Sequence, residues 1–439
     1  MKIESKDFGS KIVDSEIILK LISAKDEDFE KTKNIHNSLN RVAGVSRRSI
    51  DELPENLRFE SHFEGKVTLI QSTKISSRII IENATLSNGL IFYQCEVGDC
   101  LVKSSFINDS ILIIDSKIGD FRITLDSNIR NFHIKNSMSG IISISKNCCT
   151  GDFLIEDNSS ILNFYTGVSS VIGNFHVRNK CEIEGLRLSE GSLIGDVSFE
   201  KECKIGDIII EKGSFAGDFS FIDCTIRKFQ SEDILSNFKV VSSNIGNFFL
   251  KNCLISEFEI KQSSKIEANI VGGSINNLEF VDTSISKEAV ISFLNTKILK
   301  VKMENFAQLG NLYFRKMESL GEPFDWIDIN QQYPQLISGS LNHVDDNKND
   351  FIVFKRREYL ENFKEKTDLS VFTISQSSLG KTEFSDCDLS GFNFEFNNSK
   401  IIDCFITGGT LPGEQSNKEK GDRICVFGET KGSEKWHEQ

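Results

Sequence analysis

The chain has 439 residues, with 51 Lys and Arg against 64 Asp and Glu and a formal net charge of −13 at pH 7. This excess of negative charge disfavours nonspecific binding of the whole chain to DNA or to an anionic membrane, because both attract basic proteins. The 35 Phe against 5 Tyr and 2 Trp favour rings packed in a closed interior, where a phenol or an indole would need a hydrogen-bond partner.

Residues 1–60 show no repeat and are predicted to form a mostly helical N-terminal cap. The stretch from Asp14 to Asn40 places apolar side chains among dense charges, at Ile17, Ile18, Leu19, Leu21, Ile22 and Phe29. This pattern is typical of one or two amphipathic helices. A cap would cover the apolar edge that the first coil of a repeat array exposes. The alternative is that the segment is a docking module.

Residues 61–317 are predicted to form a β-solenoid, and the repeat is most regular from Ile142 to Phe221. Large apolar residues recur there every eleven positions, at Ile142, Phe153, Phe164, Phe175, Leu186, Val197, Ile208 and Phe219. A second set follows two residues later, at Ile144, Ile155, Thr166, Val177, Leu188, Phe199, Ile210 and Phe221. The seventh position is small, at Cys148, Ser159, Ser170, Cys181, Ser192, Cys203, Ser214 and Thr225.

Apolar residues at positions one and three of the unit, with a polar residue between them, predict a short strand with one buried face. A helix would need apolar residues at i, i+3, i+4 and i+7, and that pattern is absent. Two units then make a four-sided coil of about twenty-two residues, and successive coils stack about 4.8 Å apart. Residues 61–317 would hold about twelve coils in a rod on the order of 55–60 Å long.

The unit tends to close on Gly followed by Asp or Asn, as in Gly151-Asp152 and Gly173-Asn174. Glycine is expected to supply unusual backbone angles at this bend, and the short side chain after it to bond its own backbone. Asp196 and Asp218 would then be neighbours in adjacent coils. A bound cation is the alternative interpretation of this pair, although turn formation accounts for both residues without a metal.

After Phe219 the unit shortens toward ten residues and its halves become pentads, as in Phe238-Lys239-Val240 and Ser243-Asn244-Ile245. The clearest pentads are Thr382–Asp386 and Cys387–Gly391. They resemble the pentapeptide-repeat family, whose unit is a small residue, a polar residue, a Leu or Phe and two polar positions. The resemblance implies a right-handed quadrilateral β-helix, from which residues 142–218 depart by using units of eleven. Because the family serves many unrelated tasks, the resemblance predicts a fold and no particular function.

Residues 318–370 interrupt the repeat and are predicted to be an insertion of loop and helix. The expected helix runs from Phe351 to Lys366 and has Asp350 as its cap. The insertion gathers aromatic and arginine side chains of the kinds enriched at protein interfaces. The candidate partner-binding residues are Phe324, Trp326, Tyr333, Arg356, Arg357 and Tyr359. The alternative is that the helix shields a defect in the stack of coils.

Residues 371–411 are predicted to be a short pentapeptide-repeat block, and residues 412–439 a polar C-terminal tail. Within the tail, the apolar stretch Ile424–Phe427 is expected to add an edge strand or to cover the last coil. Met1–Asp7 has no apolar signal core, and no segment approaches the run of about eighteen apolar residues that a membrane span needs. We therefore expect no membrane span.

No catalytic or cofactor-binding motif is found in the sequence, which contains no HExxH, no GxSxG, no P-loop and no GxGxxG that opens a helix. His133 and His176 are expected to lie exposed on one face two coils apart, roughly 10 Å from each other and too far to share a metal. The outward second positions carry no carboxylate: Ser143, Leu154, Tyr165, His176, Arg187, Ser198, Ile209 and Ser220. We therefore expect no catalytic, cofactor or metal site.

Most of the eleven cysteines fall at the small positions of the repeat, where cysteine alternates with serine. This exchange favours buried, reduced thiols that serve packing, and it predicts a cytoplasmic protein. A disulfide between Cys181 and Cys203, which lie one coil apart, is the alternative.

These observations predict a noncatalytic protein–protein interaction scaffold with a protein partner and no direct binding of nucleic acid. One alternative is an acidic DNA mimic that acts on a DNA-handling enzyme such as a topoisomerase, as some pentapeptide-repeat proteins do. Against it, lysines such as Lys180, Lys201 and Lys212 interrupt the negative charge. A β-helix enzyme that acts on a polymer is a further alternative, and it would require carboxylates clustered on one flat face.

Overall fold

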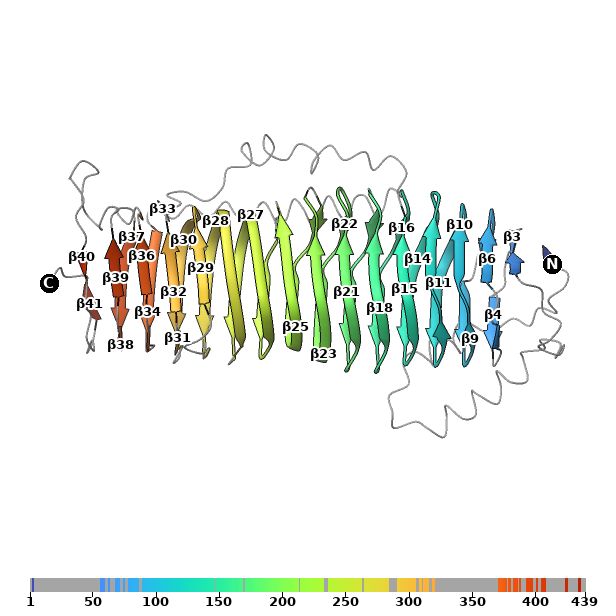
Figure 1. The fold of residues 1–439 in the computed structure, drawn as a ribbon, viewed down its shortest axis with the longest axis horizontal. Helices are drawn as coiled ribbons and strands as arrows, with labels where there is room; N and C mark the ends of the chain where they lie inside the picture. Colours follow the sequence, from blue (N-terminus) through green and yellow to red (C-terminus); the bar gives the residue numbers. More distant parts are fainter. Residues whose placement is uncertain are drawn as a thin grey trace. The chain divides into compact units, whose positions relative to one another are not determined.

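The computed structural model describes the chain in segments (Figure 1). The described residues are 2–3, 56–59, 62–63, 68–71, 74–75, 78–86, 89–145, 147–168, 170–212, 214–232, 236–262, 264–283, 290–304, 308–309, 311–315, 318–319, 370–376, 378–379, 382–385, 387, 392–397, 400–401, 404–407, 423–424 and 433–435. They form two compact units, residues 1–183 and residues 184–439, and each unit is considered by itself.

Every regular element of the described residues is a β-strand, and within each unit the strands form a parallel β-solenoid. The predicted all-β repeat architecture is thereby confirmed. No helix is present in the described segments, so nothing there supports the predicted helical cap or the helical insertion. The helices expected at Asp14–Asn40 and Phe351–Lys366 lie outside the described residues.

The strands of the first unit are β1 (Lys2–Ile3), β2 (Asn56–Phe59), β3 (His62–Phe63), β4 (Thr68–Gln71), β5 (Lys74–Ile75), β6 (Arg78–Glu82), β7 (Thr85–Leu86), β8 (Leu90–Tyr93), β9 (Glu96–Val97), β10 (Cys100–Lys103), β11 (Phe106–Ile114), β12 (Lys117–Ile118), β13 (Phe121–Thr124), β14 (Asn128–Lys135), β15 (Met138–Ile144), β16 (Cys149–Thr150), β17 (Phe153–Glu156), β18 (Ser160–Thr166), β19 (Val171–Ile172) and β20 (Phe175–Arg178). β21 (Glu182–Leu188) contains the boundary between the units.

Four parallel ladders run through the first unit, and each ladder is one wall of the coil. Wall 1 consists of β2, β6, β10, β13 and the ends of β15 and β18. Wall 2 consists of β3, β7, the start of β11, the start of β14, β16 and β19. Wall 3 consists of β4, β8, the end of β11, the end of β14, β17 and β20. Wall 4 consists of β5, β9, β12 and the starts of β15 and β18.

The second unit repeats this stacking. Its strands are β22 (Leu193–Ile194), β23 (Val197–Ile210), β24 (Phe215–Ala216), β25 (Phe219–Glu232), β26 (Phe238–Val241), β27 (Asn244–Lys261), β28 (Lys265–Val281), β29 (Val290–Leu294), β30 (Lys297–Glu304), β31 (Gln308–Leu309), β32 (Asn311–Arg315), β33 (Glu318–Ser319), β34 (Ser370–Ser375), β35 (Ser378–Leu379), β36 (Thr382–Ser385), β37 (Phe392–Asn397), β38 (Lys400–Ile401), β39 (Cys404–Thr407), β40 (Arg423–Ile424) and β41 (Ser433–Lys435).

The stack of the second unit continues across the gap between residues 319 and 370. β30 pairs with β34, and β32 pairs with β36, which places Phe314 opposite Phe384. The two rings are stacked with centroids 5.0 Å apart. β40 pairs antiparallel with β39 through Ile424, so the edge strand predicted near this residue is confirmed.

The core of each unit is a column of inward side chains, and the predicted large positions of the repeat are all buried. In the first unit Phe153 stacks on Phe132 with ring centroids 4.6 Å apart and meets Phe164 edge-on at 5.0 Å. In the second unit Phe219 stacks on Phe238 at 5.3 Å. Because phenylalanine carries no polar atom, these rings fill the interior without leaving a hydrogen bond unmade.

The small inward side chains form hydrogen bonds with backbone groups at the corners. Ser159 donates its hydroxyl to the Glu156 carbonyl at 2.6 Å and accepts the backbone N–H of Ser137 in the preceding coil at 3.2 Å. The Cys181 thiol donates to the Arg178 carbonyl at 3.1 Å in the same way. A small side chain with one donor is therefore what the position requires, which explains why serine and cysteine exchange there.

At two corners of the first unit, the spacing between large inward residues matches the number of corner residues with positive φ. Asp157 and Asn158 both have φ 58°, and the next large inward residue, Phe164, comes eleven positions after Phe153. The corner after Phe132 has the single residue Asn136 at φ 45°, and Ile142 follows Phe132 by ten. Short polar side chains tolerate this left-handed conformation better than most residues do.

The prediction that Thr225 is the small inward residue of its unit is wrong. Thr225 is exposed, and Cys224 is buried in its place and pairs with Cys203. The reason is the corner: Lys201 and Glu202 are both left-handed in one coil, whereas Asp223 alone is left-handed in the next. The shorter corner shifts the register by one residue.

Glycine at the Gly-Asp corners serves close stacking instead of unusual backbone angles. Gly151 does not have a positive φ, and a Cβ on it would lie 1.5 Å from the Arg130 carbonyl oxygen of the coil below. Only a residue without a side chain fits there. The expectation that glycine supplies the left-handed conformation at this bend is therefore wrong for Gly151.

Candidate interaction surface on wall 3

The outward side chains of wall 3 form two rows in successive coils. The register of β8, β11, β14, β17 and β20 aligns the first row as Ile91, Leu112, His133, Leu154 and His176. It aligns the second row as Tyr93, Ile114, Lys135, Glu156 and Arg178. Both rows begin with apolar residues, and the second row ends with the charged residues Lys135, Glu156 and Arg178. The wall therefore has an apolar end and an end that contains charged residues.

The apolar end is buried on its outer side. Ile91, Tyr93 and Leu112 are 7 %, 6 % and 4 % exposed and form a cluster against which Ile114 packs. Their inward neighbours Phe92 and Ile111 are completely buried. β8 is therefore buried on both faces, whereas the outward face of a solenoid wall in contact with water is expected to be exposed.

The outward row of wall 1 is also buried in the coil of β8 and differs only in the coils that follow. The register there aligns Ile80, Leu101, Arg122, Ser143 and Tyr165, and Ile80 is 8 % exposed. Arg122 and Tyr165 are exposed, and Leu101 and Ser143 are half-buried. From the coil of β10 onward, wall 1 is therefore more open on its outer side than wall 3.

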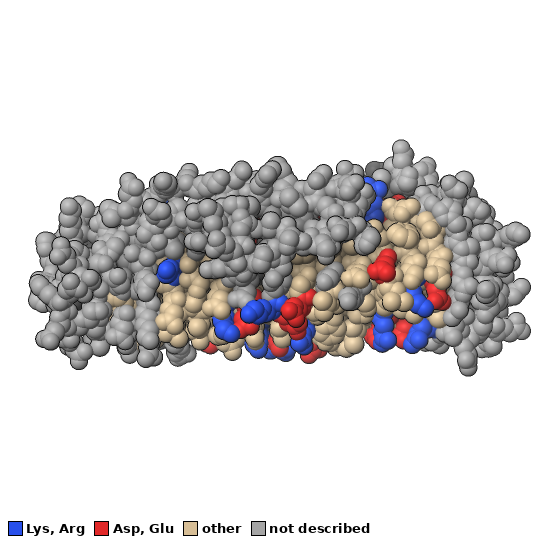
Figure 2. All heavy atoms as spheres, turned by 90° about the horizontal axis from the view of Figure 1, so that it is seen from above, with Lys and Arg blue, Asp and Glu red and all other residues tan. Residues whose placement is uncertain are grey.

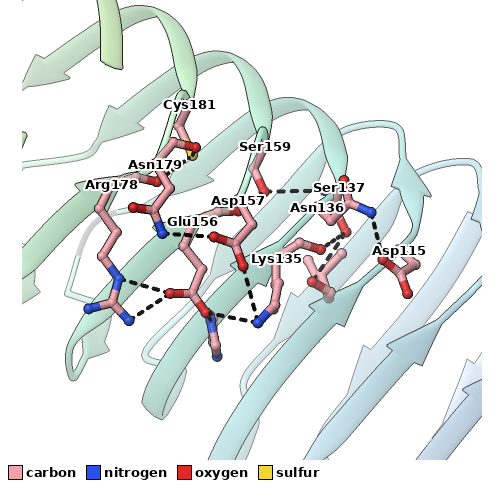
Figure 3. Close-up of polar contacts among 12 residues, drawn as sticks. Asp115, Lys135, Asn136, Ser137, Glu156, Asp157, Ser159, Arg178, Asn179 and Cys181 are labelled. Atoms are coloured by element: carbon pink, nitrogen blue, oxygen red, sulfur yellow. Dashed lines mark hydrogen bonds and ion pairs between the residues drawn. The ribbon is translucent and has the colours of Figure 1, made fainter. Parts of the chain in front are cut away.

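The charged end of wall 3 is organised around Glu156 (Figure 3). Its Oε1 accepts from His133 Nε2 at 3.0 Å, and its Oε2 accepts from Arg178 Nε at 2.8 Å and Nη2 at 2.6 Å. Lys135 Nζ lies 3.7 Å from Oε1 and 3.1 Å from Asp157 Oδ2. The network therefore connects the coils that contain β14, β17 and β20.

Glu156 is an ionised carboxylate at neutral pH. Burial by itself raises the pKa of this side chain, but the hydrogen bonds from His133 and Arg178, together with their charge, outweigh the burial and hold the pKa of Glu156 at about 2. Its two oxygens already accept three hydrogen bonds, and a general base needs a free oxygen and a pKa close to the working pH. Glu156 therefore connects adjacent coils through its hydrogen bonds and is unsuited to proton transfer.

The expectation for the histidines is correct in part. His133 and His176 do occupy one row two coils apart, with Leu154 between them. His133 is not exposed, however, because its side chain is 7 % exposed and bonded to Glu156. Glu156 was missed because the fourth position of the unit was assigned to a bend. Lys135, Glu156 and Arg178 follow one another at intervals of one coil, and this spacing in the sequence could have predicted that the three charges are neighbours.

The corner aspartates bond backbone amides. Asp152 Oδ1 accepts the backbone N–H of Asn174 at 2.8 Å, and Asp196 Oδ1 accepts that of Asp218 at 3.1 Å. Each carboxylate thus satisfies an amide of the next coil, so the prediction that it bonds the backbone of its own bend is wrong for these two residues. The described residues contain no group of three or more His, Cys, Asp or Glu side chains placed to hold a metal ion.

Nine cysteines of the described segments are free thiols, and eight of these nine are buried. Cys181 and Cys203 are both among the free thiols, so the disulfide alternative is wrong and the packing interpretation is confirmed. Burial raises the pKa of Cys148 to about 11 and that of Cys224 to about 12. Thiols in this state are poor nucleophiles at neutral pH.

The six candidate partner-binding residues predicted from the sequence, Phe324, Trp326, Tyr333, Arg356, Arg357 and Tyr359, lie outside the described residues. The described part of the chain contains no helix with the length and hydropathy needed to cross a bilayer. A scan against protein-family models, a search of curated proteins and a search of solved structures each find no match to this chain.

Proposed function

We propose that the protein is a noncatalytic scaffold that binds a protein segment on wall 3. The observation that carries the proposal is the buried outward cluster of Ile91, Tyr93 and Leu112 on wall 3. Large aromatic and aliphatic side chains of this kind are the anchors of protein interfaces, and a charged margin beside them supports specificity.

The adjoining charges agree with a binding surface better than with a catalytic one. Glu156 and Asp157 are balanced by Lys135 and Arg178 through direct ion pairs. Both oxygens of Glu156 are thus engaged, which leaves this carboxylate unsuited to the general acid or base role that the enzyme alternative would need.

The DNA-mimic alternative is less favoured, because basic side chains lie among the acidic ones along the coils. Lys103 pairs with Glu82 at 2.6 Å, and Arg227 pairs with Asp207 at 2.7 Å. Figure 2 shows basic and acidic residues intermixed over the described part of the face it presents. A duplex mimic needs a continuous negative potential, and these pairs interrupt it.

We place the scaffold among divergent relatives of the pentapeptide-repeat family and in the cytoplasm. The support for the family is the alternation of large and small buried residues at five-residue intervals, from Phe238 through Ser243, Phe248 and Cys253 to Phe258. The support for the location is the set of free, buried thiols.

The test is capture of a partner from an extract of the source cells by the full chain. Leu112→Asp puts a charge in the cluster on wall 3, and Arg122→Asp puts the same charge on wall 1 as the matched control. We expect a partner that the native chain and Arg122→Asp retain and that Leu112→Asp loses. Equal retention by both variants would remove wall 3 from the binding surface.

A further inference from the structure

The last two strands of the second unit, β40 and β41, pair antiparallel with the last coil. β37 stacks in parallel on β34, and β39 stacks in parallel on β36. β41 then pairs antiparallel with β37, with Glu434 opposite Phe396, and β40 pairs antiparallel with β39, with Arg423 opposite Ile406. Figure 1 shows β40 and β41 beyond β37 and β39 at the C-terminal end of this unit.

We propose that β40 and β41 are a blocking contact. They occupy the edges of β37 and β39 and thereby prevent a second copy of this chain from pairing with the same edges. When the two strands are displaced, the last coils of two copies bind each other end to end. This inference does not depend on the function proposed for wall 3.

The sequences of the four strands suit this role. β37 is Phe-Asn-Phe-Glu-Phe-Asn, and β39 is Cys-Phe-Ile-Thr. Apolar strands of this kind, left at the edge of a sheet, pair with strands of other chains. β40 has two residues and β41 three, and they include Arg423, Glu434 and Lys435. Because short and charged edge strands resist such pairing, the tail replaces edges that favour association with edges that oppose it.

The geometry of the last coil favours a second copy as the occupant of these edges. β38 lies between β37 and β39 along the chain, so β37 and β39 are on opposite sides of the four-sided coil. A two-fold axis perpendicular to the stack and passing through both sides reverses both strands at once. A second copy then presents its own β37 and β39 antiparallel to the first, the direction in which β41 and β40 already pair. Such an isologous contact closes on itself and gives a dimer.

A head-to-tail contact, with the first coil of one copy on the last coil of another, is less favoured. In the first unit, β2 pairs with β6 on one side and with β1 on the other. The edge of wall 1 is therefore already occupied in the first coil. We expect a dimer and not a filament.

Proline substitution in the full chain tests the blocking contact, because proline has no N–H to donate to a strand pair. Of two consecutive residues in an antiparallel pair, one exchanges hydrogen bonds with the partner strand. Both residues of β40 are therefore replaced, Arg423→Pro and Ile424→Pro, together with two of β41, Glu434→Pro and Lys435→Pro. Sedimentation velocity over a range of protein concentrations measures self-association.

We expect the native chain to sediment as a monomer and the four-proline variant to form a dimer whose dissociation constant is at least about tenfold lower. This factor follows if β40 and β41 occupy their edges at least about nine-tenths of the time. A control with prolines at Lys418, Glu419, Glu429 and Thr430, in the same tail but outside both strands, should behave like the native chain. Equal association of the variant with either the native chain or the control, or growth beyond a dimer, would overturn the proposal.

Amide hydrogen exchange locates the contact in the same samples. In the variant at low concentration, the amides of β37 and β39 should exchange at least about tenfold faster than in the native chain, and a higher concentration should restore their protection. Unchanged exchange would mean that β40 and β41 do not cover these edges. A dimer that leaves β37 and β39 unprotected would place the contact elsewhere, and either result contradicts the proposal. Since neither measurement involves wall 3, both are independent of the test of the scaffold function.

Discussion

Walls 1 and 3 of the first unit carry similar inward side chains and different outward side chains. Inward, both carry large apolar residues in every coil, such as Phe121 on wall 1 and Phe132 on wall 3, and their rings meet at 5.0 Å. Outward in the same coil, wall 1 presents the exposed Arg122 and wall 3 presents the buried His133. The repeat therefore determines the interior of the coil and leaves the exterior free, so a function specific to this chain is to be sought in the outward rows.

The largest loss of stability is expected when a ring is removed from the core that both walls enclose. Phe153→Ala removes a ring that contacts Phe132, Phe164 and Phe175, and it should lower the free energy of unfolding by about 3–5 kcal/mol. Equilibrium denaturation in urea measures this. A loss below about 1 kcal/mol would mean that the column of rings does not stabilise the stack.

The next largest loss of stability should differ between the two walls. Leu112→Ala should cost about 2–3 kcal/mol because Leu112 is nearly fully buried, whereas Leu101→Ala on wall 1 should cost about 1 kcal/mol because Leu101 is only half-buried. The same denaturation experiment compares the two variants directly. Equal costs would mean that the outer side of wall 3 is as open to water as that of wall 1.

The charged end of wall 3 predicts a dependence on pH. The pKa of Glu156 is about 2 in the fold, below the value of about 4.3 expected for an unfolded chain. A depressed pKa contributes stability that is fully present above the unfolded value and is lost as the pH falls toward the folded value. The contribution is about 2 kcal/mol at neutral pH.

Glu156→Gln tests this dependence. The stability difference between the native chain and this variant should be largest above pH 5 and should shrink as the pH falls from 5 toward 2. Asp120→Asn, at the corner before β13, is the comparison, and its stability difference should change with pH in the same direction. Burial alone would raise the pKa of Asp120, but an amide hydrogen bond from Ile141 and the Arg122 guanidinium lower it overall. A difference that does not change with pH would contradict the role assigned to Glu156.

The smallest effect is expected at the surface of wall 1. Arg122 pairs with Asp120 at 2.9 Å, and its side chain is half exposed. Exposed pairs of this kind contribute little, so Arg122→Ala should change the unfolding free energy by no more than about 0.5 kcal/mol. A loss of more than about 2 kcal/mol would show that wall 1 also depends on its outward residues.

The sequence predicted the interior of the coil well, because burial imposes a strict period. Phe153, Phe175 and Phe219 all lie in the core, as the eleven-residue spacing indicates. The prediction failed at Thr225, where a corner of one left-handed residue replaces a corner of two, and neighbouring Asn, Asp, Lys and Glu residues do not specify which corner forms.

The outer site was harder to predict than the core. Glu156, Lys135 and Arg178 are separated by twenty-one or twenty-two residues, and they meet only when the coil length at each corner is known. The outward apolar residues Ile91 and Leu112 are indistinguishable in the sequence from neighbouring core positions. The outward apolar residues can be told from core residues only when both outward rows of a wall are compared across several coils.

The corners of variable length bear on how such a chain changes over generations. Because one or two left-handed residues both close a corner, we expect insertion or deletion of a single codon at Asp157–Asn158 or at Asp223 to leave the core side chains in their columns. Related genes can then drift in length at many separate corners while their proteins keep the same cross-section. Homology among such proteins would be visible in the order of their buried aromatic residues. A sequence comparison that assumes a constant repeat length would not detect it.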